Sequence, residues 1–421
     1  MKSIRGGHFD VVVLGGGAAG TSSAVAAARS GARVLLIERY GFLGGAAANA
    51  LVLAYCGFFL KGVRPVAAVG GIGADLLGHL VAVGQDIAPI VSKSGNWIIM
   101  LDAEAVKFAF DQLVECKGLD TVLHSCAVSV SKGSSGIDAI TVNDHAGCYE
   151  VSADAFVDAS GEATLASLAG VPLSVDSRRG DKVQPASLPI RIGGVSGDAN
   201  FDREMLTAII AEHNATAKDQ IHRTDGGVMF RLPLSDDYWW MSVDVETDGL
   251  SGTCLGKAEQ QARRQAWRNL ALLQRMPGFE KAHILSTGPQ LGIRETRRPR
   301  SCEDVTGQAL TDGTRRSDGV ARAAWPMEVH EAPGRARFVD LGGQGFADIP
   351  LEALRASGCD NLFLAGRTIG ADPVAYGSVR VMGTAFATGH AAGIAAAKLA
   401  ASGVVQVSDV RRALTTQGAL I

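Results

Sequence analysis

Residues 9–39 read FDVVVLGGGAAGTSSAVAAARSGARVLLIER and predict a strand, a glycine-rich turn, a helix and a second strand. Glycines at positions 15, 17 and 20 give the spacing G-x-G-x-x-G at the point where the helix begins. Gly15 makes the tight turn, Gly17 lets backbone approach a pyrophosphate, and Gly20 lets the helix pack closely on the strand. Glu38 ends the second strand 18 residues after Gly20, where an acidic side chain hydrogen-bonds a ribose 2′-hydroxyl. The stretch predicts a dinucleotide-binding βαβ unit.

The start of the predicted helix strengthens this interpretation. Ala18 and Ala19 lie between the second and third glycines and open the helix. Its free N–H groups and the positive end of its dipole would face the phosphates. An ordinary glycine turn is the alternative, but the strand, the helix and the acid at Glu38 are all in place, and this context favours the nucleotide site.

Composition describes a globular protein with ample core. Charged residues make up 20% and apolar residues 47% of the 421 residues. The length suggests about three domains, although one large α/β fold can absorb more chain. A net charge of −3 provides no basic field for nucleic acid or an anionic membrane.

The cysteine pattern and the hydropathy of the sequence indicate the cellular compartment. The seven cysteines are an odd number without a C-x-x-C pair, which argues against a disulfide framework, a zinc site and a dithiol redox pair. The N-terminal residues lack an apolar signal core, and no apolar run of about 18 residues occurs. We expect a cytoplasmic protein without a membrane span or a metal site.

The rest of the sequence divides into regions of different composition. After a helix that starts at Asp102, strands are expected at 121–124, 127–130, 137–142, 149–152 and 155–158. From about 172 the chain is more charged, with strands expected at 187–193, 227–232 and 238–245 and helices at 203–213 and 257–274. Residues 361–403 then predict a strand, a loop and a long Ala/Gly-rich helix. The expected domains are 1–171 and 341–421, which form the nucleotide-binding part, and an inserted domain over 172–340.

Five segments together resemble a known family. They are GGGAAG with Glu38, GFLGG, DASGEATLA, GIRETRRP and residues 361–393, from NLFLAGR to ATGHAAG. The chain is similar to the FAD-dependent oxidoreductases that carry GIRETRR and have the glutathione-reductase-type FAD-binding fold. The resemblance implies an α/β fold, in which a Rossmann-like FAD-binding domain of central parallel sheet plus β-meander carries an inserted α+β substrate domain.

The resemblance also implies roles for residues in an FAD site. Glu38 would hold the adenosine ribose, and the helix near Val379 would face the N1–C2=O edge of the flavin, stabilising negative charge there by about 0.3–2 kcal/mol. The other implied FAD-binding residues are Gly15, Gly17, Ala18, Ala19, Gly20, Arg39, Gly44, Gly45, Val128, Asp158, Gly161, Gly366 and Asp372. Residues 40–50 contain no histidine for covalent attachment, so we expect dissociable FAD. The redox-active C-x-x-x-x-C and the NAD domain of disulfide reductases are absent from the sequence.

The GIRETRRPR segment offers a candidate substrate clamp. Four arginines fall within seven residues, and a guanidinium matches a carboxylate bidentately. We therefore predict that Arg294 and Arg297 bind an anionic group. The alternative is a solvated strand whose surface ion pairs contribute about 0–1 kcal/mol each.

Flavin oxidation of a C–H bond also needs a proton acceptor. Tyr376, Arg380, Glu295 and His330 are the candidates, and Tyr376 and His330 join Arg294 and Arg297 as the predicted catalytic residues. His330 is expected in a loop beside Trp325. Cys56 either faces the active site or is an inert packing residue.

The predicted function is that of an FAD-dependent dehydrogenase or oxidase. It would transfer a hydride between a small polar, carboxylate-bearing metabolite and non-covalently bound FAD. A redox-neutral flavoenzyme (lyase, isomerase or desulfurising enzyme) and an electron-transfer subunit of a complex are the alternatives. The sequence identifies neither the electron acceptor nor the oligomeric state, and a homo-oligomer stays open.

Overall fold

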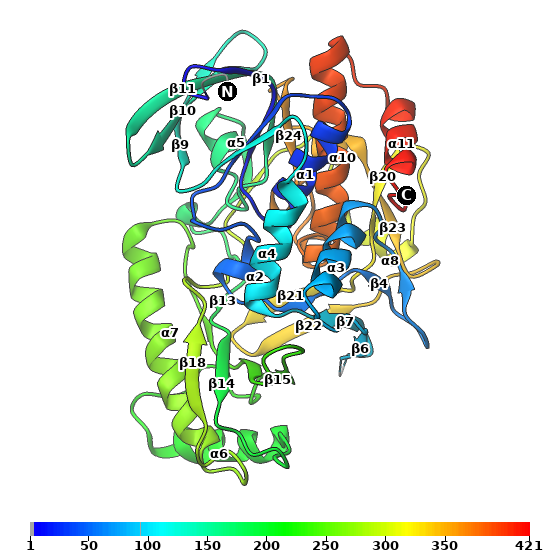
Figure 1. Cartoon of the computed structure of the whole chain (residues 1–421). Helices are drawn as coiled ribbons and strands as arrows, with labels where there is room; N and C mark the ends of the chain where they lie inside the picture. The colour runs from blue at the N-terminus through cyan, green and yellow to red at the C-terminus, as the bar shows by residue number, and fades with distance from the viewer. Residues whose placement is uncertain (1–3, 93) are drawn as a thin grey trace.

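A twisted parallel sheet forms the centre of the computed structural model, which describes residues 4–92 and 94–421 (Figure 1). Strand β1 (His8–Leu14) pairs with β2 (Val34–Ile37) on one side and with the second half of β11 (Gly147–Asp158) on the other. Beyond them, β8 (Leu119–Val122) pairs with β2, and β24 (Leu362–Leu364) pairs with β11. All four pairings are parallel, so the carboxyl ends of these strands meet at one edge of the sheet.

A β-meander extends the sheet through β11. The first half of this long strand is antiparallel to β10 (Ile137–Asp144), which pairs in turn with β9 (Cys126–Lys132). The strands expected at 149–152 and 155–158 are therefore one continuous strand. Its first half belongs to the meander and its second half to the parallel sheet.

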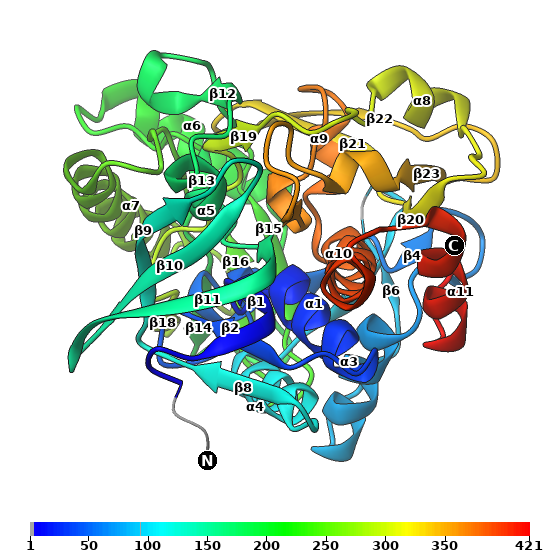
Figure 2. The same ribbon diagram turned by 90° about the horizontal axis from the view of Figure 1, so that it is seen from above.

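Two small-residue helices lie side by side against the sheet (Figure 2). They are α1 (Ala18–Arg29) and α10 (Met382–Ser402). A Cβ atom at Gly389 or Gly393 would overlap the backbone oxygen of Ala19 or Ser23. Ser22 Oγ donates a 2.8 Å hydrogen bond to the carbonyl oxygen of Phe386. The C-terminal part of the chain is thereby packed into the βαβ unit at its N-terminus.

Other short elements complete this part of the molecule. The helices are α2 (Ala46–Asn49), α3 (Ile72–Ala82), α4 (Ala103–Val114), α5 (Thr164–Leu168) and α11 (Val407–Thr416). The strands are β3 (Ala54–Tyr55), β4 (Phe59–Leu60), β5 (Val66–Ala67), β6 (Ile90–Val91) and β7 (Trp97–Met100). Asp102 caps α4 by accepting hydrogen bonds from the backbone N–H groups of Glu104 and Ala105, as its sequence pattern predicts.

A second layer with its own core projects from the first, drawn in green in Figure 1. An antiparallel sheet in the order β15 (Val228–Arg231), β16 (Tyr238–Met241), β14 (Ile190–Gly193), β18 (His283–Thr287) accompanies α6 (Arg203–Thr216) and α7 (Gly252–Leu273). Its buried apolar residues fall between positions 186 and 291. Apolar residues from 305 to 349 pack instead with the first core. The domain division expected at 172 and 340 stays a prediction.

Small strand pairs lie outside the two larger sheets. β12 (Leu173–Asp176) pairs with β19 (Arg297–Pro299), and β13 (Ala186–Ser187) pairs with β17 (Asp244–Val245). β20 (Gly319–Ala323) pairs with β23 (Ala347–Pro350), while β21 (Met327–Ala332) and β22 (Arg335–Val339) form a hairpin. The helices α8 (Gly307–Asp312) and α9 (Tyr376–Val379) lie in the same region. No helix in the described part of the chain is long and apolar enough to cross a membrane.

Candidate functional site

The glycine-rich turn is built so that no side chain fits at its first and third glycines. Gly15 has φ +103°, and a Cβ there would lie 2.5 Å from the carbonyl oxygen of Ala159. A Cβ at Gly20 would overlap the backbone oxygen of Gly15. The turn therefore packs against both α1 and the loop that follows β11, at the carboxyl edge of the sheet.

Glu38 closes the other side of this turn. Its carboxylate accepts a 2.6 Å hydrogen bond from Gly16 N and a 2.9 Å hydrogen bond from Tyr40 N. The side chain is buried, and this burial raises the pKa of the carboxyl group. Each carboxylate oxygen keeps capacity for another donor, as a pair of ribose hydroxyls would require. The backbone N of Ser125 donates to Glu38 O at 2.9 Å, which brings the start of β9, and Val128 three residues later, toward the same edge.

The GFLGG segment lies over the glycine-rich turn. Gly44 N donates a 2.9 Å hydrogen bond to Gly16 O, and both Gly44 and Gly45 have positive φ angles. A Cβ at Gly45 would lie 2.7 Å from the Cα atom of Gly17. Two backbone segments without side chains thus face each other, which suits a ligand held through backbone groups.

Asp158 orders the turn after β11 from inside. Its carboxylate accepts hydrogen bonds from Ser160 N and Oγ at 3.1 and 2.7 Å and from Ala166 N at 2.8 Å. The side chain is completely buried, so it positions the turn and does not reach a ligand itself. Gly161, with φ +81°, lies in this turn.

Gly161 is followed by Glu162, which forms an ion-pair network that the sequence did not reveal. Glu162 lies 3.7 Å from Arg39 Nη2 and accepts a 2.7 Å hydrogen bond from Arg367 Nη2. Arg367 follows Gly366, whose Cβ would lie 2.9 Å from the Cβ atom of Ala19. The predicted positions Arg39, Gly161 and Gly366 therefore lie around one ion-pair network beside the first turn of α1.

The segment before α10 differs in detail from the expectation. Asp372 accepts hydrogen bonds from the backbone N–H groups of Gly307, Val374 and Ala375 at 2.6, 2.8 and 2.7 Å. These bonds hold the loop that leads into α9, and the expected place of Asp372 beside the flavin stays a prediction. Val379 ends α9, and the long helix begins three residues later at Met382, because the intervening chain leaves the helical path at Val381.

Arg294 and Arg297 do not form a clamp. Arg294 Nη2 contacts Asp244 at 3.3 Å, and its Nη1 hydrogen-bonds Pro185 O. Arg297 turns toward the turn after β11, where it donates to Glu162 O and Ser167 Oγ, both at 2.8 Å. The two guanidinium groups are engaged by different parts of the protein. The solvated-strand alternative is also wrong, because Arg294, Glu295, Thr296 and Arg298 are all buried.

His330 lies on β21 and not in a loop. Its Nε2 atom lies 3.0 Å from Glu328 Oε1, and the two residues share a face of the strand because they are two positions apart. The other carboxylate oxygen of Glu328 accepts a 3.0 Å hydrogen bond from Trp325 Nε1. The backbone oxygen of Glu328 accepts a 3.1 Å hydrogen bond from Arg380 Nη2. Glu328 is thus the centre of a group that joins β21 to the start of α10.

Charges around His330 set its protonation. Burial and the nearby guanidinium of Arg294 lower the pKa of His330 to about 4, against the effect of Glu328. The pKa of Glu328 is lowered to about 2 by His330 and Arg380 in spite of its burial. At neutral pH, this group therefore contains a neutral imidazole beside an ionised carboxylate.

Tyr376, Cys56 and Glu295 are poor proton acceptors in this arrangement. The Tyr376 hydroxyl donates a 3.1 Å hydrogen bond to Arg294 O, and burial raises its pKa to about 12. Burial and the neighbouring Glu328 raise the pKa of the Cys56 thiol, so it stays protonated. Glu295 accepts a 3.1 Å hydrogen bond from Gln184 N and pairs with Arg298 at 3.2 Å. His330 is the remaining base of the predicted set.

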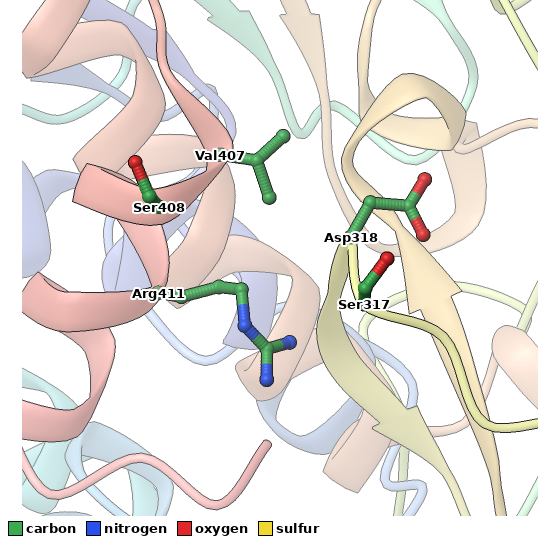
Figure 3. A pocket seen from close by; sticks show the side chains of 5 residues that line it. All are labelled: Ser317, Asp318, Val407, Ser408 and Arg411. Carbon is green, nitrogen blue, oxygen red and sulfur yellow. The ribbon is translucent and has the colours of Figure 1, made fainter.

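The residues at the carboxyl edge of the sheet fit an FAD. The glycine-rich turn and the GFLGG segment present backbone where an added Cβ would collide, and Glu38 presents a buried carboxylate with free acceptor capacity. In the described chain, no group of His, Cys, Asp and Glu side chains is arranged to hold a metal ion. An open pocket elsewhere is lined by Ser317, Asp318, Val407, Ser408 and Arg411 (Figure 3). It lies between α11 and the segment before β20, away from the glycine-rich turn.

Comparisons with known proteins agree with this architecture. A family model described as FAD dependent oxidoreductase matches residues 10–418. CabE, an aromatic hydroxylase from angucycline biosynthesis, is 11% identical with a TM-score of 0.50, over 96% of this chain and 65% of CabE. A geranylgeranyl bacteriochlorophyll reductase-like protein from Thermoplasma acidophilum is 14% identical with a TM-score of 0.49, over 97% of this chain and 83% of that protein. At such identities the likeness concerns the fold alone. No curated protein sequence matches the chain.

Proposed function

Because the chain belongs to the FAD-dependent oxidoreductase family, with FAD as its cofactor, we propose that it oxidises a small polar metabolite bearing a carboxylate. When bound, FAD supplies a hydride acceptor in its isoalloxazine ring. The protein would supply the charge that holds the acid and the base that takes its proton. The group formed by Arg294, Glu328, His330, Tyr376 and Arg380 is our candidate for both tasks.

One observation carries this proposal: within the described chain, Arg380 has no carboxylate within ion-pair distance, although its charge acts on the nearby carboxylate of Glu328. Arg223 pairs with Asp225 and Asp244, and Arg294 also pairs with Asp244. Arg380 forms no ion pair within the described residues, and its buried Nε atom has no hydrogen-bond partner there. Arg380 is half-buried as a residue, but a buried N–H donor without an acceptor is costly unless a ligand provides one. A carboxylate bound at Arg380 would satisfy it, which moves the predicted anion site from Arg294 and Arg297 to Arg380.

The placement of Arg380 connects this site to the cofactor region. It directly precedes the turn into α10, whose body packs on α1 behind the glycine-rich turn. Gly383, in the first turn of α10, donates a 2.9 Å hydrogen bond to Cys56 O. The segment that follows the GFLGG loop therefore meets the start of α10 beside Arg380. A substrate held here would lie where chain from both FAD-binding segments converges.

Anaerobic mixing of the purified FAD-loaded protein with a panel of small carboxylates tests the proposal. We expect persistent, stoichiometric bleaching of the flavin by at least one acid and none by the corresponding uncharged amide. Turnover without an external acceptor and without persistent bleaching would instead support a redox-neutral flavoenzyme. A partner protein that copurifies and alone reduces the flavin would support an electron-transfer subunit. Bleaching by neutral compounds in preference to acids would contradict the carboxylate assignment.

A further inference from the structure

Arg380 and His330 are joined through a single residue. The backbone oxygen of Glu328 accepts from Arg380 Nη2 at 3.1 Å, and its carboxylate lies 3.0 Å from His330 Nε2. The charge of Arg380 also lowers the pKa of His330, so the guanidinium and the imidazole are near neighbours. A ligand that contacts both has its two matching groups close together, and the smallest acid of this kind carries its carboxylate and its hydroxyl on adjacent carbons.

The imidazole presents one nitrogen for chemistry. Because Nε2 faces an ionised carboxylate, the proton of the neutral ring belongs on Nε2. Nδ1 then carries the lone pair, and it has no hydrogen-bond partner within residues 4–92 and 94–421. Glu328 also stabilises the imidazolium that forms when Nδ1 takes up a proton. It is held in place by Trp325 Nε1 at 3.0 Å.

Surrounding charge favours a hydroxyl over an ammonium group as the proton donor. Arg294 and Arg380 both face His330, and both act to lower its pKa. Of the neighbouring carboxylates, Asp244 pairs with Arg223 and Arg294, and Glu328 lies beside His330 and accepts a hydrogen bond from Trp325. A substrate ammonium would add a cation next to Arg294 and Arg380, whereas a hydroxyl adds no charge.

We propose that the substrate is a 2-hydroxy acid whose carboxylate binds Arg380 and whose hydroxyl proton passes to Nδ1 of His330, with Glu328 as the positioning residue. The inference rests on the proposed function. In the step, the C2–H bond breaks and its electron pair leaves as a hydride to FAD, the O–H bond breaks as Nδ1 takes the proton, and a C=O bond forms. The substrate loses two electrons and becomes a 2-oxo acid.

Substrate binding would itself strengthen the base. Arg294, Arg380, Glu328 and Asp244 are the charged groups that act on His330 from the elements packed around it. A bound carboxylate would neutralise the field of Arg380, and removing that cationic field acts to raise the pKa of the imidazole. The protein would thus hold His330 uncharged while the site is empty of substrate and make it more basic once the acid binds.

The first test compares positional isomers on the FAD-loaded protein under anaerobic conditions. We expect 2-hydroxy acids such as glycolate, lactate, 2-hydroxybutyrate and mandelate to include the fastest flavin reductants. Their 3-hydroxy isomers, such as 3-hydroxypropionate and 3-hydroxybutyrate, should be at least about 100-fold slower, a loss typical of misplaced reacting groups. Faster bleaching by 3-hydroxy acids would overturn this inference while leaving the proposed function intact. Absence of bleaching by any carboxylate would contradict the proposed function itself.

Variants separate the role of His330 as the base from that of Arg380 in binding the carboxylate. His330→Gln should slow flavin reduction by about 10²- to 10⁴-fold with little change in substrate affinity. Arg380→Met should weaken the binding of the 2-oxo acids pyruvate and 2-oxobutyrate by about 10- to 100-fold, followed through the flavin absorbance. Glu328→Gln should slow reduction and shift its pH profile. His283→Gln and Arg335→Met, at exposed positions, are the matched controls and should behave as the unchanged protein.

A second readout does not depend on turnover. In protein with ¹⁵N-labelled histidine, the His330 ring should show the Nε2–H form, and its pKa should rise when pyruvate or oxalate is added. The rise should be lost in Arg380→Met. A ring that carries its proton on Nδ1, or a pKa unaffected by every 2-oxo acid and by oxalate, would overturn the inference even if 2-hydroxy acids reduce the flavin.

Discussion

The carboxylate of Glu38 accepts a 2.6 Å hydrogen bond from the backbone amide of Gly16, 22 positions earlier in the chain. This contact ties the end of β2 to the turn that follows β1. The same carboxylate is buried and keeps capacity for further donors, and we propose that it also binds the ribose of FAD.

Replacing Glu38 tests this double role. Glu38→Arg should abolish tight FAD binding, because it places a cation where two hydroxyl donors must be accepted. Glu38→Gln keeps one acceptor oxygen and should bind FAD with intermediate affinity. The affinities follow from titration of the apoprotein with FAD by flavin fluorescence. Glu150→Arg, at an exposed position of the same sheet, is the control, and equal FAD affinity for Glu38→Arg and Glu150→Arg would remove the ribose assignment.

The packing of α1 on α10 predicts opposite effects for two glycine-to-alanine changes. Gly389→Ala should destabilise the protein by about 2 kcal/mol or more, because the new methyl group overlaps the backbone oxygen of Ala19 and the helices must separate. Gly256→Ala lies in α7 with no atom near its new Cβ, and should stabilise by about 0.5–1 kcal/mol. Denaturant unfolding measures both. Equal effects would mean that the helices tolerate a wider separation.

Arg297 should stabilise the fold and should not bind the substrate. Arg297→Met removes the donors to Glu162 O and Ser167 Oγ, and should lower the free energy of unfolding by about 1–3 kcal/mol. FAD affinity should fall with it, because both partners follow the turn that Asp158 positions. The KM of the reducing substrate should stay unchanged. A raised KM with unaltered stability and FAD affinity would return Arg297 to the substrate site.

Sequence patterns predicted what depends on local geometry. The glycine-rich turn, the acid at Glu38 and the capped helix after Asp102 all follow from spacing over fewer than about 25 residues, and the structure contains each of them. The continuity of β11 was missed because Ala153 and Asp154 interrupt its apolar pattern where the strand passes from the meander into the parallel sheet.

The candidate site depends on contacts between distant segments. Arg380 meets Glu328 across 52 positions, and Arg294 meets Asp244 across 50. Periodicity cannot tell which of several arginines is neutralised by a distant aspartate, so the clamp was assigned to Arg294 and Arg297. A signal for the contact between Glu328 and His330 existed in their alternation in MEVHEA. This alternation places the two side chains on one face only if the segment is a strand, as it is in the structure.

His390 predicts how the fold responds to acid. It is buried on α10 with Nε2 2.9 Å from Gln417 Oε1, and burial lowers its pKa from the usual 6.5 to about 4. The unfolded chain therefore binds a proton between about pH 6.5 and 4 that the folded chain does not. Stability is full above pH 6.5 and falls as the pH drops through this window, by about 3 kcal/mol in all for a difference of about 2.5 in pKa.

His390→Gln removes this proton uptake while keeping a hydrogen-bonding side chain toward Gln417. The variant should be less stable than the unchanged protein at pH 7, because the ring packs against Gly71, but it should lose about 2 kcal/mol less between pH 7 and pH 4.5. His330 contributes in the same window and stays in both proteins, so the difference isolates His390. Urea unfolding at the two pH values measures it, with His283→Gln as the exposed control. Parallel losses in His390→Gln and the unchanged protein would mean that the buried ring is already protonated in the folded state.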